Sequence, residues 1–151
     1  MTSTDATTTT EDLTEQAARL RLAVNRMARR LRQEAPTDLG PASIAALATI
    51  ERSGPLTPSE LARIEAVQRP TATRILARLS DAGLVRRAAD PEDGRCSIVQ
   101  ISPEGRRALR RLRKRKTAYL ARTMRELPDD EVATLTRAAE ILERVLEEDR
   151  G

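Results

Sequence analysis

Arginine and hydroxyl side chains are concentrated in residues 68–78, where they could bind an anion. At about 100° per residue, a helix over residues 69–82 has an apolar face and an opposite polar face. The candidate contact residues on the polar face and the first turn are Gln68, Arg69, Pro70, Thr71, Thr73, Arg74 and Arg78. A guanidinium group can bond guanine O6 and N7 or a phosphate bidentately, and threonine can bond a phosphate or touch a thymine methyl.

This polar face has two interpretations. An ordinary solvated helix face usually mixes charges of both signs, which favours pairs four residues apart. This one has no acidic residue before Asp81, and its small residues would let it enter a major groove about 12 Å wide. The pattern therefore favours contact with duplex DNA.

A second candidate contact is the loop 90–95, between two short strands predicted at residues 85–88 and 97–101. Asp-Gly is a common hairpin turn, which alone would explain the composition of the loop. In the functional interpretation, Gly94 permits a sharp tip from which Arg95 enters a narrow minor groove, where the potential is most negative. Asp93 would then orient the guanidinium group rather than contact DNA. The helix that precedes the loop favours this second interpretation.

Capping and turn signals predict the elements that hold these groups. A helix starts at Pro41, and residues 57–60 form a capping box with proline at the first helical position, so a second, short helix begins there. Gly83 ends the helix that carries the arginines. A short helix, a tight link, a second helix and a basic-tipped hairpin make a winged helix-turn-helix, which we assign to residues 41–102.

Both ends of the chain are predicted to be helical. Residues 1–10 are rich in threonine and are expected to form a disordered tail. Amphipathic helices follow at 11–35 and 103–148, flanking the lobe within a single domain over residues 11–151. Their apolar stripes are too long for so small a lobe to cover. The mainly α (α+β) fold is therefore expected to form a homodimer through these helices, the alternative being an intramolecular bundle.

Composition excludes several classes of protein. The chain has one cysteine, Cys96, and no histidine, which rules out an internal disulfide, a Cys/His zinc site and histidine-based catalysis. We expect no cofactor, no metal and no enzymatic activity. No apolar run approaches the roughly 18 residues of a membrane span, and the start lacks a signal-peptide core, so a cytoplasmic protein is expected.

Two further features have alternative explanations. The basic run 106–116 could extend a phosphate-binding surface or pair with the acidic last helix of either subunit, and the second is favoured because charge runs on long helices are usually solvated or paired. Cys96 could be a redox switch if Arg95 activated its thiolate. Since the chain has no resolving cysteine, a buried small residue is favoured.

Several of these motifs together resemble the MarR family of bacterial transcriptional regulators over about residues 11–148. The motifs are Leu61-Ala62, Arg69-Pro70-Thr71-Ala72-Thr73-Arg74-Ile75, Gly83-Leu84-Val85-Arg86-Arg87, Asp90…Asp93-Gly94-Arg95 and Ile101-Ser102-Pro103-Glu104-Gly105. The resemblance implies a homodimer with winged helix-turn-helix lobes, usually a repressor bound to a short pseudo-palindrome. Gln68 departs from the pattern, which often has serine or another good cap there. Either Gln68 contacts phosphate itself or the helix start is looser.

The resemblance also implies that a small, often phenolic or lipophilic, effector releases the DNA. Met27, Ile44 and Leu47 could line its pocket, although the same residues would serve equally well as core. The sequence thus favours a sequence-specific regulator of double-stranded DNA. The alternative is a winged helix used only for protein interaction, and salt dependence separates the two, because phosphate contacts predict a steep loss of affinity with salt.

Overall fold

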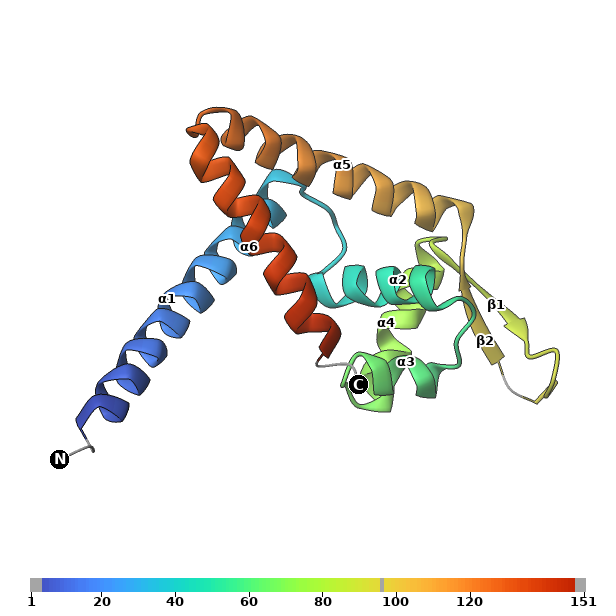
Figure 1. The fold of residues 1–151 in the computed structure, drawn as a ribbon. Coiled ribbons are helices and arrows are strands. Elements are labelled where there is room, and N and C mark those ends of the chain that lie inside the picture. The colour runs from blue at the N-terminus through green and yellow to red at the C-terminus, as the bar shows by residue number, and fades with distance from the viewer. Residues whose placement is uncertain (1–3, 96, 149–151) are drawn as a thin grey trace. The chain divides into compact units, whose positions relative to one another are not determined.

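The computed structural model describes residues 4–95 and 97–148 of the 151-residue chain. It is mainly helical, with one two-stranded antiparallel sheet (Figure 1). In chain order the elements are α1 (Thr4–Glu34), α2 (Pro41–Ser53), α3 (Pro58–Ile64), α4 (Arg69–Asp81), β1 (Val85–Ala89), β2 (Ser97–Ile101), α5 (Pro103–Arg125) and α6 (Asp129–Glu148). They form two compact units, one of residues 35–115 and the other of the segments before and after it. The fold class predicted from the sequence is confirmed.

Residues 35–115, here called the lobe, have a continuous apolar core. Its largest fully buried side chains come from α2, α3, α4 and β2, namely Leu47, Ile50, Leu61, Leu76, Leu79 and Val99. Strand β1 pairs with β2, and Leu56 adds a short bridge to Val99 on the other side of β2. The apolar face predicted for the helix at residues 69–82 is the face that α4 buries. Burial of these side chains therefore fixes which face of α4 is left for solvent.

The start of α3 is held by the capping box that the sequence predicts. The hydroxyl of Thr57 accepts a hydrogen bond from the amide of Glu60 at 3.2 Å, and the Glu60 carboxylate accepts one from the amide of Thr57 at 2.7 Å. This exchange satisfies two amides that a helix start otherwise leaves free. The short turn to α4 contains Ala66 in the left-handed region, with φ 51°. The link between the two helices is thus as tight as expected.

The Ser-Pro-Glu-Gly motif joins α5 to the end of α4. The Ser102 hydroxyl donates to the carbonyl of Gly83 at 2.6 Å and accepts from the amide of Gly105 at 3.0 Å. A Cβ on Gly105 would overlap the carbonyl oxygen of Leu84 and lie 2.8 Å from Cγ1 of Ile101. Only glycine therefore lets the first turn of α5 approach β1 and β2 this closely.

The structure departs from the sequence prediction at two boundaries. Helix α1 already begins at Thr4, so residues 4–10 are helical where we expected a disordered tail; residues 1–3 lie outside the described part. Extending an existing helix costs far less than starting one, even through threonine. The lobe extends beyond residue 102 to residue 115, because Leu109 joins its core and Leu112 is buried.

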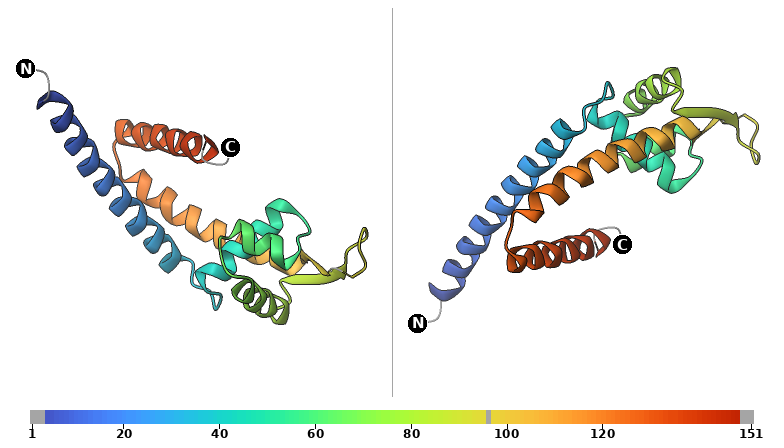
Figure 2. Two further views of the ribbon diagram at one scale, coloured as in Figure 1. Left: turned by 90° about the horizontal axis from the view of Figure 1, so that it is seen from below. Right: turned by 90° about the horizontal axis from the view of Figure 1, so that it is seen from above.

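In the second unit, α6 turns back from the end of α5 after residues 126–128 (Figure 2). Arg30 of α1 donates a hydrogen bond to the hydroxyl of Tyr119 at 3.3 Å and pairs with Glu34 at 2.7 Å. The hydrogen bond from Arg30 lowers the pKa of Tyr119. The apolar stripes of α1 and α6 stay largely exposed, and α6 has no buried residue.

Candidate nucleic-acid interface

Helix α4 presents the side chains that the sequence singles out. Gln68, Arg69, Pro70, Thr73, Arg74 and Arg78 are exposed, and Thr71 is half-buried. Gln68 is the residue before the first turn, but its side chain makes no capping hydrogen bond. Thr73 donates its hydroxyl to the carbonyl of Arg69 at 3.0 Å. The amide group of Gln68 is therefore not used to start the helix, whose first turn instead relies on proline.

The exposed face of α4 is positively charged and uncompensated. Arg69, Arg74 and Arg78 form no ion pair with any residue that the structure describes. Arg74 and Arg78 lie one helical turn apart and both border a groove shared with α2, whereas Arg69 lies at the start of the helix, away from that groove. The three guanidinium groups are all exposed, but they divide between two parts of the face.

The β1–β2 loop is fixed by two aspartates. Asp90 accepts a hydrogen bond from the amide of Glu92 at 2.9 Å, and Asp93 accepts one from the amide of Arg95 at 3.1 Å. The role expected for Asp93, in orienting the Arg95 guanidinium, stays a prediction beside this bond to the main chain. The bond shapes the backbone from which the exposed Arg95 side chain extends.

The conformation of Gly94 differs from the sharp Asp-Gly turn that we predicted. Among the described residues, the glycines with positive φ are Gly54 and Gly83. A two-residue Asp-Gly turn of the common hairpin type needs positive φ at the glycine. The strands pair as far as Ala89 and Ser97, close to the ends predicted for them, and a connection of this length needs no positive φ at Gly94. Cys96 lies outside the described residues.

The basic run on α5 is partly paired inside the lobe. Arg113 forms an ion pair with Glu51 of α2 at 2.7 Å, and Arg107 pairs with Glu104 one turn earlier. The Arg107–Glu104 pair is exposed on both sides and contributes little to stability, whereas the Glu51 carboxylate is largely covered. Pairing of the run with α6, which the sequence favoured, stays a prediction.

Of the three residues suggested for an effector pocket, two belong to the core of the lobe. Leu47 is fully buried in the core of the lobe, and Ile44 packs against that core. Met27 belongs to the other unit, where it is 41% exposed on α1. The alternative interpretation of Ile44 and Leu47, as core residues, is the one that the structure supports, because α2 packs against both α3 and α4 in the lobe.

Sequence reasoning predicted the helix start at Pro41 but did not identify this start, or Ser43, as part of a candidate site. Ser43 is 3% exposed and borders the groove with Arg74 and Arg78. A signal was present in Gly40-Pro41, since neither residue has a side chain that can cap a helix start. What the sequence alone does not give is which end of α2 faces α4.

Two helices joined by a tight turn, with a β-hairpin after the second and an unpaired cationic face on it, define a winged helix-turn-helix DNA-binding domain. Residues 39–97 match the MarR family. The chain is 34% identical to an uncharacterised helix-turn-helix-type transcriptional regulator of Mycobacterium leprae, over 87% of this chain and 93% of that protein. It is 32% identical to the multiple antibiotic resistance protein MarR of Salmonella typhimurium, over 66% of this chain and 70% of that protein.

A solved structure supports the same assignment. A Pseudomonas aeruginosa protein assigned as a transcriptional regulator is 36% identical, with a TM-score of 0.80 over 90% of this chain and 96% of its own. The present chain belongs to the MarR family and is a DNA-binding transcriptional regulator. This confirms the family resemblance, and it confirms that the chain is not an enzyme. In the described residues, no helix is long and apolar enough to span a membrane.

Proposed function

We propose that the protein is a repressor that binds a pseudo-palindromic operator in double-stranded DNA as a homodimer, with α4 in the major groove. The observation that carries this proposal is the exposed set of arginines on α4, which pair with no carboxylate in residues 4–95 and 97–148. Burial of Ala72, Leu76 and Leu79 directs the polar side of the helix outward. A rigid helix with that charge supplies both attraction to phosphates and hydrogen-bond donors for base edges.

The β1–β2 loop supplies the second contact in this proposal. Arg95 is exposed, and Asp93 holds its main-chain amide in place. Arginine is the residue most suited to a narrow minor groove, since the potential there is strongly negative. Arg95 therefore adds affinity that depends more on groove shape than on base identity.

Dimer formation is proposed because the terminal helices leave apolar side chains uncovered. On α6, Leu135, Leu142, Val145 and Leu146 are 46%, 39%, 52% and 57% exposed. Fully burying one such side chain stabilises by about 1.5–3 kcal/mol. A second copy of the chain is the partner that covers these stripes and that also presents two α4 helices to a symmetric operator.

Release of the DNA by a small effector is proposed from the family resemblance alone. Its binding site is not placed at Met27, Ile44 and Leu47, because Leu47 is part of the core. Repression would follow from occupancy of the operator. Repression would be lost when a ligand binds the DNA-free protein more tightly than it binds the DNA-bound protein.

The test compares arginine variants on a cognate operator duplex and on a scrambled duplex. Arg69→Ala and Arg74→Ala should each cost about 1–3 kcal/mol on the operator and reduce the preference for it. Arg29→Ala is the matched control, because Arg29 is exposed on α1, away from its apolar stripe. If both α4 variants discriminate the two duplexes as well as the wild type does, α4 does not read the major groove.

A further inference from the structure

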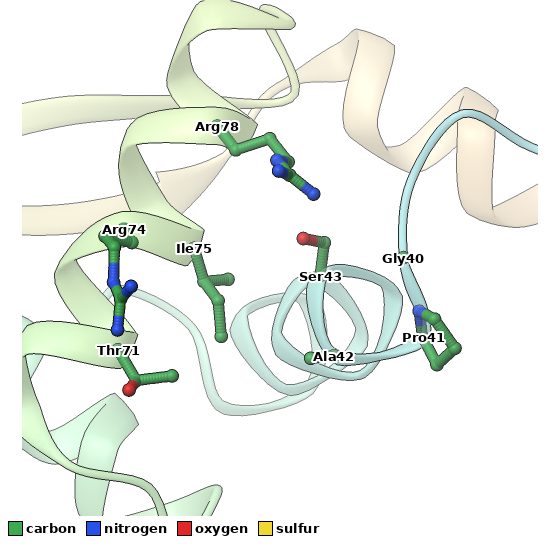
Figure 3. A pocket seen from close by; sticks show the side chains of 8 residues that line it. All are labelled: Gly40, Pro41, Ala42, Ser43, Thr71, Arg74, Ile75 and Arg78. Atoms are coloured by element: carbon green, nitrogen blue, oxygen red, sulfur yellow. The ribbon is translucent and has the colours of Figure 1, made fainter.

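A groove lies between the start of α2 and the side of α4, within the lobe (Figure 3). It has a volume of about 280 Å³. Helix α2 contributes its first turn and α4 one side, and the lining residues are Gly40, Pro41, Ala42, Ser43, Thr71, Arg74, Ile75 and Arg78. None of the eight is acidic, and two are arginines. The groove is therefore a cationic hollow beside the recognition helix.

The start of α2 provides uncapped amides at this groove. Gly40 precedes the first turn and gives no side-chain cap, and Pro41 has no amide hydrogen. The first amide with a helical partner is that of Ile44, which donates to the carbonyl of Gly40 at 3.1 Å. The amides of Ala42 and Ser43 have no acceptor among the described residues. Free amides and the positive end of the helix dipole favour an anion there.

Ser43 gives an independent indication of a ligand. Its side chain is buried, with only 3% of the residue exposed, yet its hydroxyl has no hydrogen-bond partner in residues 4–95 and 97–148. Figure 3 shows that this hydroxyl points into the space between α2 and α4. Among the described residues, no fully buried side-chain oxygen lacks a hydrogen-bond partner, so the Ser43 hydroxyl is open to the groove rather than sealed in the core. The hydroxyl is thus positioned to donate to a group that enters the groove.

The two arginines complete the arrangement from the other side. Both arginines line the groove, but only Arg78 extends from α4 toward Ser43, whereas Arg74 runs along α4 toward Thr71 (Figure 3). No carboxylate in the described part of the chain pairs with either of them. Guanidinium groups form charge-assisted, often bidentate, hydrogen bonds with phosphate oxygens. A helix start, a hydroxyl and the guanidinium group of Arg78 around one hollow form a site for a tetrahedral oxyanion.

We infer that this groove binds one phosphate of the DNA backbone through the start of α2, the hydroxyl of Ser43 and the guanidinium group of Arg78. The inference rests on the proposed function, since a helix in the major groove has a phosphate strand along each side. Arg78 is then a phosphate contact rather than a base contact. It fixes the position of α4, while Arg69 and Arg74 face the bases.

The test uses an operator duplex in which single phosphates are replaced, one at a time, by uncharged methylphosphonate. Binding is measured for the wild type, Ser43→Ala and Arg78→Gln. For the wild type, one position in each half-site should weaken binding roughly tenfold. The same replacement should have a smaller effect on each of the two variants, because each has already lost one of the groups that hold this phosphate. Arg78→Gln should also reduce the slope of log affinity against log salt by about 1.

Two controls separate this effect from loss of folding. Ser43→Ala removes a hydroxyl that holds no partner within the described structure, so its melting temperature should match that of the wild type. Ser53→Ala changes an exposed serine at the opposite end of α2, and it should keep the wild-type response at every phosphate. Equal responses of wild type, Ser43→Ala and Arg78→Gln at all positions would overturn the inference, as would a relaxed base preference in Arg78→Gln.

A free phosphate is the competing source of the same chemistry, and inorganic phosphate is the probe for it. If millimolar phosphate raises the melting temperature of the wild type but not of Ser43→Ala, and no backbone position depends on Ser43, the groove is a free-anion site and the DNA assignment is wrong. The proposed function is tested separately, and it fails if the wild type does not prefer the operator to the scrambled duplex. In that case, a phosphate position whose replacement weakens binding of the wild type more than binding of Ser43→Ala and Arg78→Gln would still support phosphate binding in the groove.

Discussion

Gly105→Ala is expected to destabilise the lobe, because the surrounding atoms leave no space for the added methyl group. The new Cβ would overlap the carbonyl oxygen of Leu84 and lie 2.8 Å from Cγ1 of Ile101. Overpacking of this kind typically costs about 1–3 kcal/mol, and the upper end applies here because one obstacle is backbone. Alanine is better than glycine in a helix by about 1 kcal/mol. The net loss should therefore be about 2 kcal/mol.

Urea unfolding followed by far-ultraviolet circular dichroism measures this loss. Gly94→Ala is the matched control, because a Cβ at that position meets nothing within 4 Å and Gly94 has no positive φ. It should leave the free energy of unfolding within about 0.5 kcal/mol of the wild type. Should Gly105→Ala be as stable as Gly94→Ala, α5 does not approach β1 as closely as described, and the role given to the Ser-Pro-Glu-Gly motif is wrong.

Three further predictions concern the dimer, the capping box and the loop. Leu142→Glu combined with Leu146→Glu should shift sedimentation velocity to the monomer, because two charges replace exposed apolar side chains on α6; an unchanged dimer would place the interface elsewhere. The hydrogen bond from the Thr57 amide lowers the pKa of Glu60 below its ordinary 4.5. The ionised Glu60 carboxylate therefore contributes fully to the stability of the fold above pH 4.5, and this contribution is lost as the pH falls through the pKa of Glu60 in the folded protein. Glu60→Gln should therefore lose less stability than the wild type on acidification, and parallel curves would count against this. Arg95→Ala should weaken operator binding in a mobility-shift assay with little change in base preference; unchanged affinity would remove the loop from the interface.

Local signals in the sequence were sufficient for most of the fold. The capping box at Thr57, the helix end at Gly83 and the spacing of Leu76 and Leu79 depend on neighbours a few residues away. Each therefore predicted its element correctly. The start of α1 was misplaced because propensity alone disfavours a threonine run, whereas the adjoining helix extends through it.

The features that the sequence did not give depend on contacts between distant segments. The groove forms because Ser43 of α2 and Arg78 of α4 line the same hollow. The residue spacing within either helix does not predict how the two helices pack against each other. The sequence could not decide whether Leu47 belongs to the core or lines a pocket, because an apolar side chain fits either place. The packing of α2 in the structure shows that Leu47 is buried. The bounds of the loop between the strands were predicted correctly, but the sharp tip expected from the Asp93-Gly94 pair differs, because Gly94 has no positive φ.

The central claim, that two α4 helices read a symmetric DNA site, is tested most directly by selecting bound sequences from a pool of random duplexes with the wild-type protein. The account predicts one enriched motif with two-fold symmetry and half-site centres about 10–10.5 base pairs apart. Recovery of unrelated sequences without a shared motif, or of a single half-site without symmetry, would contradict it.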